Sequence, residues 1–263
     1  KYTLKPTRTP LSLTHLDLPH LPYYPLLPHL PHLSLTSIIS LSCPSLTHLH
    51  IGGLQLTDEH FRDLGNLPLQ YLSIGGGAGV TDTAMAFIST CPLRSLNISK
   101  CGVTAKGLRM LPPLRTILLR NCLLLTDTGV VAIAHFTLLH IDLRGCKVTD
   151  LGVSALRHCP LLQRADLSNL PHVTDVGATQ LALHCPHLTS ISLGPRITDA
   201  TLAAFAVNCA YLEFFDLSGC PVTSQGVLGF ATQSPATFLC LGGCRVGVRG
   251  VKVLRKIGVR FRL

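Results

Sequence analysis

Cysteine and histidine are the residues of this chain best suited to chemistry, and the sequence holds eleven cysteines and thirteen histidines. Such side chains could ligate zinc, but zinc sites use tight Cys-x2-Cys or Cys/His groups. The chain offers only the adjacent pairs His158-Cys159 and His184-Cys185, without a second half at ligand spacing. The spacing therefore predicts no metal site.

Catalytic motifs are also missing from the sequence, which has no Gly-x-Ser-x-Gly elbow and no Gly-x-x-x-x-Gly-Lys-Ser/Thr phosphate loop. Residues 75–79 place glycines between an expected strand and an expected helix, but no Lys-Ser/Thr pair follows, so an ordinary turn explains them better. The sequence predicts a protein that is not an enzyme, with no cofactor and no small-molecule substrate. Six histidines follow a repeat instead of converging on a Ser or Cys: His15, His48, His50, His135, His140 and His187.

That repeat, about 24 residues long, runs from the mid-forties to the C-terminus. Each copy opens with Leu-x-x-Leu-x-Leu or a close variant, and most continue to an apolar-Thr-Asp-x-Gly phrase about a dozen residues later. Such a period is typical of solenoids, which expose a long binding surface. The first anchors are Leu46, Leu69, Leu93, Leu114, Leu138, Leu162, Leu188, Leu212 and Ala236.

Most cysteines fall into two columns of this repeat, one eight residues after the first anchor and one two or three residues before the next anchor. This pattern predicts small, buried, reduced thiols. We therefore expect an intracellular protein in a reducing compartment, in the cytoplasm or on the cytoskeleton, with an organelle as the alternative. The first column holds Cys101, Cys122, Cys146, Cys220 and Cys244, and the second holds Cys43, Cys91, Cys159, Cys185 and Cys209.

Residues 138–160 show how one repeat should fold. Apolar and polar residues alternate over 138–143, which predicts a short strand. Thr149 is a good helix N-cap, Asp150 places negative charge at the helix N-terminus, and Pro160 ends the helix. We expect the same role at helix starts for six aspartates: Asp58, Asp82, Asp127, Asp150, Asp175 and Asp199.

Successive strands should pair in parallel, because each helix returns the chain to the same side. The expected fold class is an α/β solenoid, a curved horseshoe with parallel strands on the concave face and helices on the convex face. We divide the chain into residues 1–42, a proline-rich segment with degenerate capping repeats, and residues 43–263, a domain of nine repeats with a basic C-terminal cap.

The proline-rich segment has two interpretations. Its prolines recur at every third residue, which matches one face of a polyproline II helix and would suit an SH3-like partner. We favour an irregular cap over Leu46, Leu49 and Ile51, because the phrases at 13–18 and 30–35 read as strands without a full helix. The prolines are Pro19, Pro22, Pro25, Pro28 and Pro31.

These phrases resemble the cysteine-containing class of leucine-rich repeats, whose motif reads roughly Cys-Pro-x-Leu-x-x-Leu-x-Leu-x-x-Cys and then apolar-Thr-Asp-x-Gly-Leu. Residues 209–223 are a close copy, and the match covers roughly residues 43–255. The resemblance implies a leucine-rich-repeat solenoid. Proteins of this class include substrate receptors of F-box ubiquitin ligases, a related regulator of mitotic exit and components of the axonemal dynein regulatory complex. Residues 1–40 show no F-box pattern, so a ligase role would need an F-box upstream of Lys1.

The concave face is the expected binding surface, and its residues lie two, four and six positions after each first anchor. Arginine and aromatic residues are the usual anchors of protein interfaces. The alternative for Arg144 and Asp166 is that they pair with each other across strands. The candidate residues are His48, His50, Tyr71, Asn97, Arg120, His140, Asp142, Arg144, Arg164, Asp166, Phe214, Asp216 and Phe238.

The net charge of +9 is concentrated at the C-terminal end, because no acidic residue follows Asp216. This basic edge is either a docking site for an acidic protein or a solvated cap. We disfavour nucleic acid as the partner, and no apolar run approaches the roughly 18 residues of a membrane span. The candidate residues of the edge are Arg249, Lys252, Arg255, Lys256, Arg260 and Arg262.

Together these features predict a non-catalytic scaffold that binds proteins, as a structural or adaptor component of a larger assembly such as a cytoskeletal, axonemal or organellar complex. The alternative is the substrate-recognition repeat domain of an SCF-type ubiquitin ligase.

Overall fold

The computed structural model describes residues 15–18, 44–52, 56–77, 79–234, 238–256, 258 and 260–263. The predicted polyproline face, the strand phrase at 30–35, Cys43 and the anchor Ala236 lie outside these residues. In the described part the strands are β1 His15–Leu18, β2 His48–Gly52, β3 Tyr71–Gly75, β4 Ser95–Asn97, β5 Thr116–Leu118, β6 His140–Asp142, β7 Arg164–Asp166, β8 Ser190–Ser192, β9 Phe214–Asp216, β10 Phe238–Cys240 and β11 Arg260–Arg262.

The helices follow the strands in alternation from the third strand onward. They are α2 Asp82–Ile88, α3 Ala105–Leu108, α4 Asp127–Ile133, α5 Asp150–Ala155, α6 Asp175–His184, α7 Asp199–Asn208, α8 Ser224–Gln233 and α9 Val248–Lys256. Short 3-10 turns complete the list: η1 Asp58–Phe61, η2 Asp63–Asn66 and η3 Leu156–His158.

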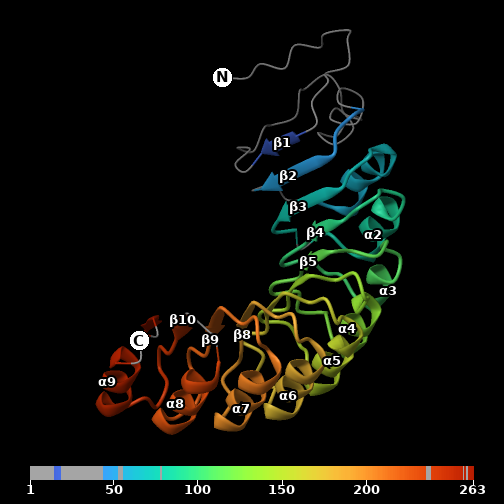
Figure 1. Cartoon of the computed structure of the whole chain (residues 1–263). Helices are drawn as coiled ribbons and strands as arrows, with labels where there is room; N and C mark the ends of the chain where they lie inside the picture. Colours follow the sequence, from blue (N-terminus) through green and yellow to red (C-terminus); the bar gives the residue numbers. More distant parts are fainter. Residues whose placement is uncertain are drawn as a thin grey trace.

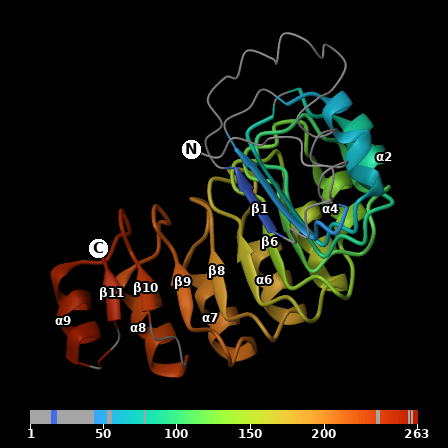
Figure 2. The ribbon, with the colours of Figure 1, turned by 90° about the horizontal axis from the view of Figure 1, so that it is seen from above.

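All strands belong to one sheet in the order β1 to β11, and every neighbouring pair is parallel. The sheet curves, with the strands lining the concave side and the helices on the convex side (Figure 1). A second view shows β8 to β11 side by side above α6 to α9 (Figure 2). Each strand from β2 to β10 begins two residues after one of the nine predicted anchors, so the predicted α/β solenoid is confirmed.

One continuous core runs along the solenoid, from Leu46 in the first repeat to Leu254 in α9. In the eight repeats from Leu46 to Leu212 the anchor leucine points inward, as does the second residue of each strand from β2 to β10, and these side chains are almost fully buried. Burying such a side chain contributes about 1.5–3 kcal/mol, so regular spacing of leucines is enough to specify the stack. Phe205, Phe215 and Phe230 widen this core near the C-terminal end, with ring centroids 5.1 and 5.2 Å apart.

The six aspartates lie at helix starts as predicted, but their carboxylates reach the next repeat. Asp150 accepts hydrogen bonds from the Thr174 amide at 2.8 Å and from the Thr174 hydroxyl at 2.7 Å. Asp175 binds Thr198 in the same way. Burial works to raise the pKa of Asp175, but hydrogen bonds from Thr201 and Thr198 outweigh it and hold that pKa below its usual value. We call this two-bond arrangement the Asp–Thr contact.

The glycine of the Thr-Asp-x-Gly phrase follows from this contact. The Gly177 amide donates to Asp150 at 3.0 Å, and a Cβ on Gly177 would lie 2.5 Å from the same carboxylate oxygen. Gly152 stands in the same relation to Asp127. At Gly152 and Gly177 the aspartate of the preceding repeat therefore occupies the space that a Cβ would need. The same position holds Ala84 beside Asp58 and Thr201 beside Asp175, so those two junctions accommodate a side chain.

Of the nine described cysteines in the two columns, eight are buried as predicted, and Cys244 is half-buried. Their thiols donate to backbone carbonyls of the preceding repeat, for example Cys146 to Leu119 at 3.0 Å and Cys220 to Gly194 at 3.0 Å. Burial raises the pKa of both thiols to about 12. Ten cysteines are described and all are free of disulfides.

Both ends of the stack carry a further strand, and the one at the N-terminal side confirms the strand predicted from the phrase at 13–18. β1 pairs with β2 and so extends the sheet at the N-terminal side. At the C-terminal side the basic cap predicted after the ninth repeat contains a further strand, because Arg260–Arg262 pairs with β10. The reason is that Phe261 lies in register with the buried Leu239 and packs against the core.

Candidate protein-binding face

The strand register sorts the outward side chains of the concave face into three rows. The first row contains the first residue of each short strand, the second row contains its third residue, and the third row lies two positions further on. His140 and Asp142 of β6, for example, lie beside Arg164 and Asp166 of β7. The predicted residues are thereby brought onto one continuous surface.

Two ion pairs occupy the centre of this face. Arg120 contacts Asp142 with an N–O distance of 2.8 Å, and Arg144 contacts Asp166 at 2.9 Å. The alternative stated for Arg144 and Asp166 is therefore what the structure shows: they pair across strands. The hydrogen bond and charge of Asp142 raise the pKa of Arg120.

Further hydrogen bonds hold these carboxylates in place. Asp142 is only 6% exposed, and its second oxygen accepts the Arg144 amide at 3.0 Å. Asp166 accepts both the amide and the hydroxyl of Ser168, and the Arg144 Nε donates to that hydroxyl at 2.7 Å. A hydrogen-bonded network of this kind keeps side chains in one geometry, so the centre of the face is rigid.

Arg164 differs from the other two arginines. Its side chain is exposed, and within the described residues no carboxylate lies within 4.0 Å of it. Its neighbour His140 is half-buried and lies 3.3 Å from the Thr116 hydroxyl. Burial and, second, the charge of Arg164 lower the pKa of His140. Arg164 is therefore a guanidinium of this face whose charge no nearby carboxylate matches within the described residues.

Aromatic pairs flank the charged centre. Phe214 and Phe238 stack with ring centroids 5.7 Å apart and planes at 6°. On the other side His48 and Tyr71 stack at 5.9 Å. Asn97 donates to Ser73 at 3.1 Å and accepts from Ser99, so it is part of the polar network between the two regions.

Several residues of the same rows were not among the sequence candidates. The repeat spacing already points to most of them, but their side chains lack the charge, amide or aromatic ring that marked the candidates. They are Ser73, Ser95, Thr116, Leu118, Ser190, Ser192 and Cys240, together with Arg260 and Arg262, which the analysis assigned to the basic edge.

The predicted basic edge divides between two layers. Arg249, Lys252, Arg255 and Lys256 are exposed on α9, whereas Arg260 and Arg262 are exposed on β11 and face the same side as the concave rows. None of the six forms an ion pair with the described residues. The edge is therefore two basic surfaces, one of which continues the concave face.

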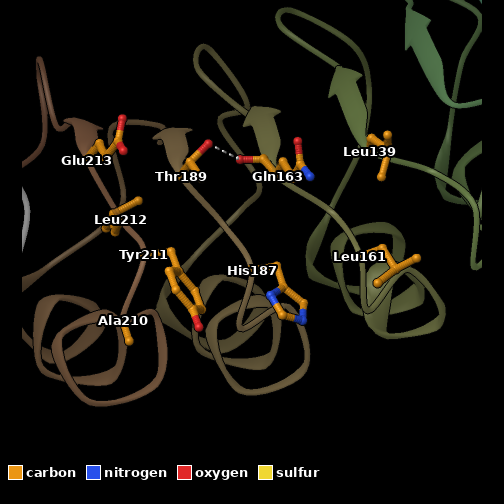
Figure 3. A pocket seen from close by; sticks show the side chains of 9 residues that line it. All are labelled: Leu139, Leu161, Gln163, His187, Thr189, Ala210, Tyr211, Leu212 and Glu213. Carbon is orange, nitrogen blue, oxygen red and sulfur yellow. Dashed lines mark hydrogen bonds between the residues drawn. The ribbon is translucent and has the colours of Figure 1, made fainter.

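A hollow of about 620 Å³ lies on the flank of the solenoid, where the loops after the helices lead into β7, β8 and β9. Figure 3 shows Leu161, His187 and Tyr211 pointing into it below Gln163 and Thr189. His187 stacks on Tyr211 with centroids 5.8 Å apart, and Tyr211 is 61% exposed. The sequence gives no sign of this hollow, because its residues share no repeated type.

The described ranges were searched for groups of metal ligands and for helices that could span a membrane. They contain no group of three or more His, Cys, Asp or Glu side chains that could hold a metal ion. None of the helices in these ranges is both long enough and apolar enough to cross a bilayer.

A family model described as leucine-rich repeat matches residues 91–111, 135–156 and 208–231. The three matches fall on three of the repeats whose strands and helices are described above. The fold is a leucine-rich-repeat solenoid.

Three relatives of this solenoid place it among known proteins. Antagonist of mitotic exit network protein 1 of Eremothecium gossypii is 31% identical over 103 residues, which is 36% of this chain and 26% of that protein. Tsukushi of Rattus norvegicus is 27% identical over 174 residues, 60% of this chain and 49% of that protein. The chain thus spans about a quarter and about half of the lengths of these curated relatives.

The third relative is a solved structure, yeast Rad7 in complex with Elc1. It superposes on this chain with a TM-score of 0.61 at 16% identity, and the match covers 82% of this chain and 68% of that chain. At this identity the likeness concerns the fold alone. The comparisons support a leucine-rich-repeat family, and they do not decide between its cysteine-containing class and the others.

Proposed function

We propose that this chain is a non-catalytic scaffold that binds partner proteins through its concave sheet, as a structural or adaptor component of a larger assembly. One observation carries the proposal: a rigid network of paired charges lies beside an exposed Arg164 and the stacked Phe214 and Phe238 on one face. Arginine and aromatic side chains dominate the energy of protein interfaces.

The geometry supports this role in a second way. Side chains that are already fixed lose little conformational freedom on binding, which favours association. The ion pairs of Arg120 and Arg144 are such fixed groups. Leucine-rich repeats are generally protein-interaction domains, and Rad7, which shares the fold, forms a complex with Elc1.

We also propose that the protein works in a reducing compartment, in the cytoplasm or on the cytoskeleton. The support is the pattern of its thiols: the ten described cysteines are free, and most are buried at repeated positions. The division into a capping segment at 1–42 and a repeat domain at 43–263 belongs to the same proposal.

Affinity purification from native extract with matched variants tests the function. The wild-type chain is compared with Arg164→Glu on the concave face and with Arg157→Glu, whose side chain is also exposed but belongs to η3 on the helix layer. We expect a stoichiometric partner that is retained by Arg157→Glu and lost by Arg164→Glu. Equal recovery with both variants contradicts binding through the concave face.

The same experiment tests the ligase alternative. Recovery of a ligase adaptor and a cullin at unit stoichiometry would favour a substrate receptor, whereas subunits of a cytoskeletal or organellar complex would favour the scaffold.

The basic edge is a second proposed docking surface for an acidic partner. Changing Arg255, Lys256, Arg260 and Arg262 to Glu should abolish assembly at moderate salt without unfolding the repeats, because all four side chains are exposed. Unchanged assembly would leave the concave face as the binding site.

A further inference from the structure

From β7 to β11 the first row of the concave face carries arginine at both ends and aromatic side chains between them. The register places one residue from each strand side by side, in the order Arg164, Ser190, Phe214, Phe238 and Arg260. The five strands lie next to one another in the sheet (Figure 2). A stacked aromatic pair thus lies between two arginines on the same line.

Both arginines of this line are exposed, and neither has a carboxylate within 4.0 Å in the described part of the chain. Arg120 and Arg144, which follow strands four and three positions away from Phe214, each have an aspartate. The face therefore has paired arginines at its centre and unmatched arginines on both sides of Phe214 and Phe238.

The second row limits what can lie across this line. From β7 to β11 it contains Asp166, whose charge Arg144 matches, and then Ser192, Asp216, Cys240 and Arg262. Asp216 uses one carboxylate oxygen to accept the Ser218 amide at 2.9 Å. A nucleic-acid strand carries a negative charge at every nucleotide and would meet these aspartates. A peptide needs only two carboxylates, and its amide N–H groups can donate to the aspartates.

We propose that the line from Arg164 to Arg260 binds an extended, acidic segment of a partner protein, with an aromatic or large apolar side chain on Phe214 and Phe238 and one carboxylate on each arginine. This inference rests on the proposed function, because it names the partner chemistry at the same face. Arginine binds carboxylates with two parallel hydrogen bonds, and aromatic side chains stack on one another.

The distance between neighbouring strands determines how far apart the contacting residues lie in the partner segment. Neighbouring strands lie about 4.8 Å apart, so Arg164 and Arg260 are separated by about 19 Å. An extended chain advances about 3.3 Å per residue, which places the two acidic residues about six positions apart. The aromatic residue should lie about two positions from the acid over Arg260 and about four from the acid over Arg164.

Selection from a random twelve-residue peptide library displayed on phage tests the proposal, with the full chain as bait. We expect the selected peptides to carry two Asp or Glu residues about six positions apart with Phe, Tyr, Trp or Leu between them. Synthetic copies should lose about tenfold or more in affinity for Arg164→Glu, and for the double variant Phe214→Ala/Phe238→Ala. They should bind Arg157→Glu as they bind the wild type.

A charge exchange makes the test independent of folding defects. Replacing the acid that lies over Arg164 by Lys in the synthetic peptide should weaken binding to the wild type and restore it to Arg164→Glu. Recovery by the exchanged pair requires direct contact between the two side chains.

The other outcomes overturn the proposal at different levels. If the selected peptides lack the two acidic residues but lose affinity for Phe214→Ala/Phe238→Ala, this inference is wrong and the proposed function still stands. The inference is also wrong if the selected peptides bind every concave variant as they bind the wild type, or if no peptide is selected. The proposed function is wrong as well if, in the affinity purification, Arg164→Glu recovers the partner as the wild type does. Tighter binding of a twelve-nucleotide oligothymidine through Arg164 would assign the line to nucleic acid instead.

Discussion

Arg164 is the residue on which the proposed binding face depends most, and its electrostatic effect can be measured without a partner. It lies beside His140 in the sheet, and its charge is one of the causes that lower the pKa of His140, after burial. A positive neighbour disfavours protonation of an imidazole.

Arg164→Ala should therefore raise the pKa of His140, which will stay below its ordinary value because burial remains. An NMR titration of the His140 ring protons gives the value, with Arg157→Ala as the control that should leave it unchanged. An unaltered pKa in Arg164→Ala would mean that the guanidinium points away from His140.

Substitution of Gly177 tests whether the glycine of the Thr-Asp-x-Gly phrase is needed beside the aspartate of the preceding repeat. Because a Cβ at this position would lie 2.5 Å from the Asp150 carboxylate, Gly177→Ala should destabilise the fold by about 1–3 kcal/mol in urea unfolding. Gly229, an exposed helical glycine with open space around its Cα, is the matched control. Gly229→Ala should be neutral or stabilise by up to about 1 kcal/mol. Equal effects would show that the close approach has no energetic weight.

At the scale of elements, the Asp–Thr contact joins each helix start to the next. Two described junctions lack it. Ser224 stands at the aspartate position before α9, where its hydroxyl accepts the Gly247 amide at 3.0 Å. Ala105 stands at that position before α4, and the Thr126 hydroxyl bonds to Thr128 instead. Neighbouring junctions on both sides have the contact, through Asp82 and Asp127. The third helix is also among the shortest, Ala105–Leu108.

Ala105→Asp should therefore supply the missing contact and raise the free energy of unfolding by about 0.5–1.5 kcal/mol. Urea denaturation measures the gain. In the Thr126→Val background the hydroxyl donor is gone, so most of the gain should disappear. A full gain in that background would attribute the effect to the helix dipole alone.

Much of this architecture could be predicted from the sequence, because leucine spacing and threonine caps act within one repeat. The strand that begins at His140 and the helix that begins after Thr149 are examples. The partner of Asp150 could not be predicted, because its carboxylate bonds to Thr174 in the next repeat. Nor could the role of Arg260, because the repeat pattern weakens before β11 and only its pairing with β10 places it on the concave face.

For the candidate site, the repeat spacing correctly placed outward residues on one surface. It could not distinguish Arg144, which is held by Asp166, from Arg164, which is not. That difference depends on side-chain geometry across strands, and it decides which arginine is available to a partner.

At the scale of the whole molecule, the continuous core makes the reactivity of thiols a test of the stack. Burial raises the pKa of Cys185 and Cys209 to about 12, so almost none of either thiol is ionised at pH 8. Under native conditions a thiol reagent should modify the half-buried Cys240 and Cys244 before any cysteine that is fully buried in the described ranges. Mass spectrometry of the labelled peptides identifies the order, and after unfolding in urea all eleven should react. Fast native labelling of Cys185 would contradict the continuous core.

The central claim is that the concave sheet, not the helix layer, contacts the partner. Site-specific photo-crosslinking in native extract tests it most directly, with benzoylphenylalanine placed at Phe214 on the sheet or at Leu183, which is 50% exposed on α6. Both positions tolerate a large apolar side chain. We predict that the Phe214 position yields one discrete crosslinked protein and the Leu183 position does not. A crosslink from Leu183 alone would contradict the account.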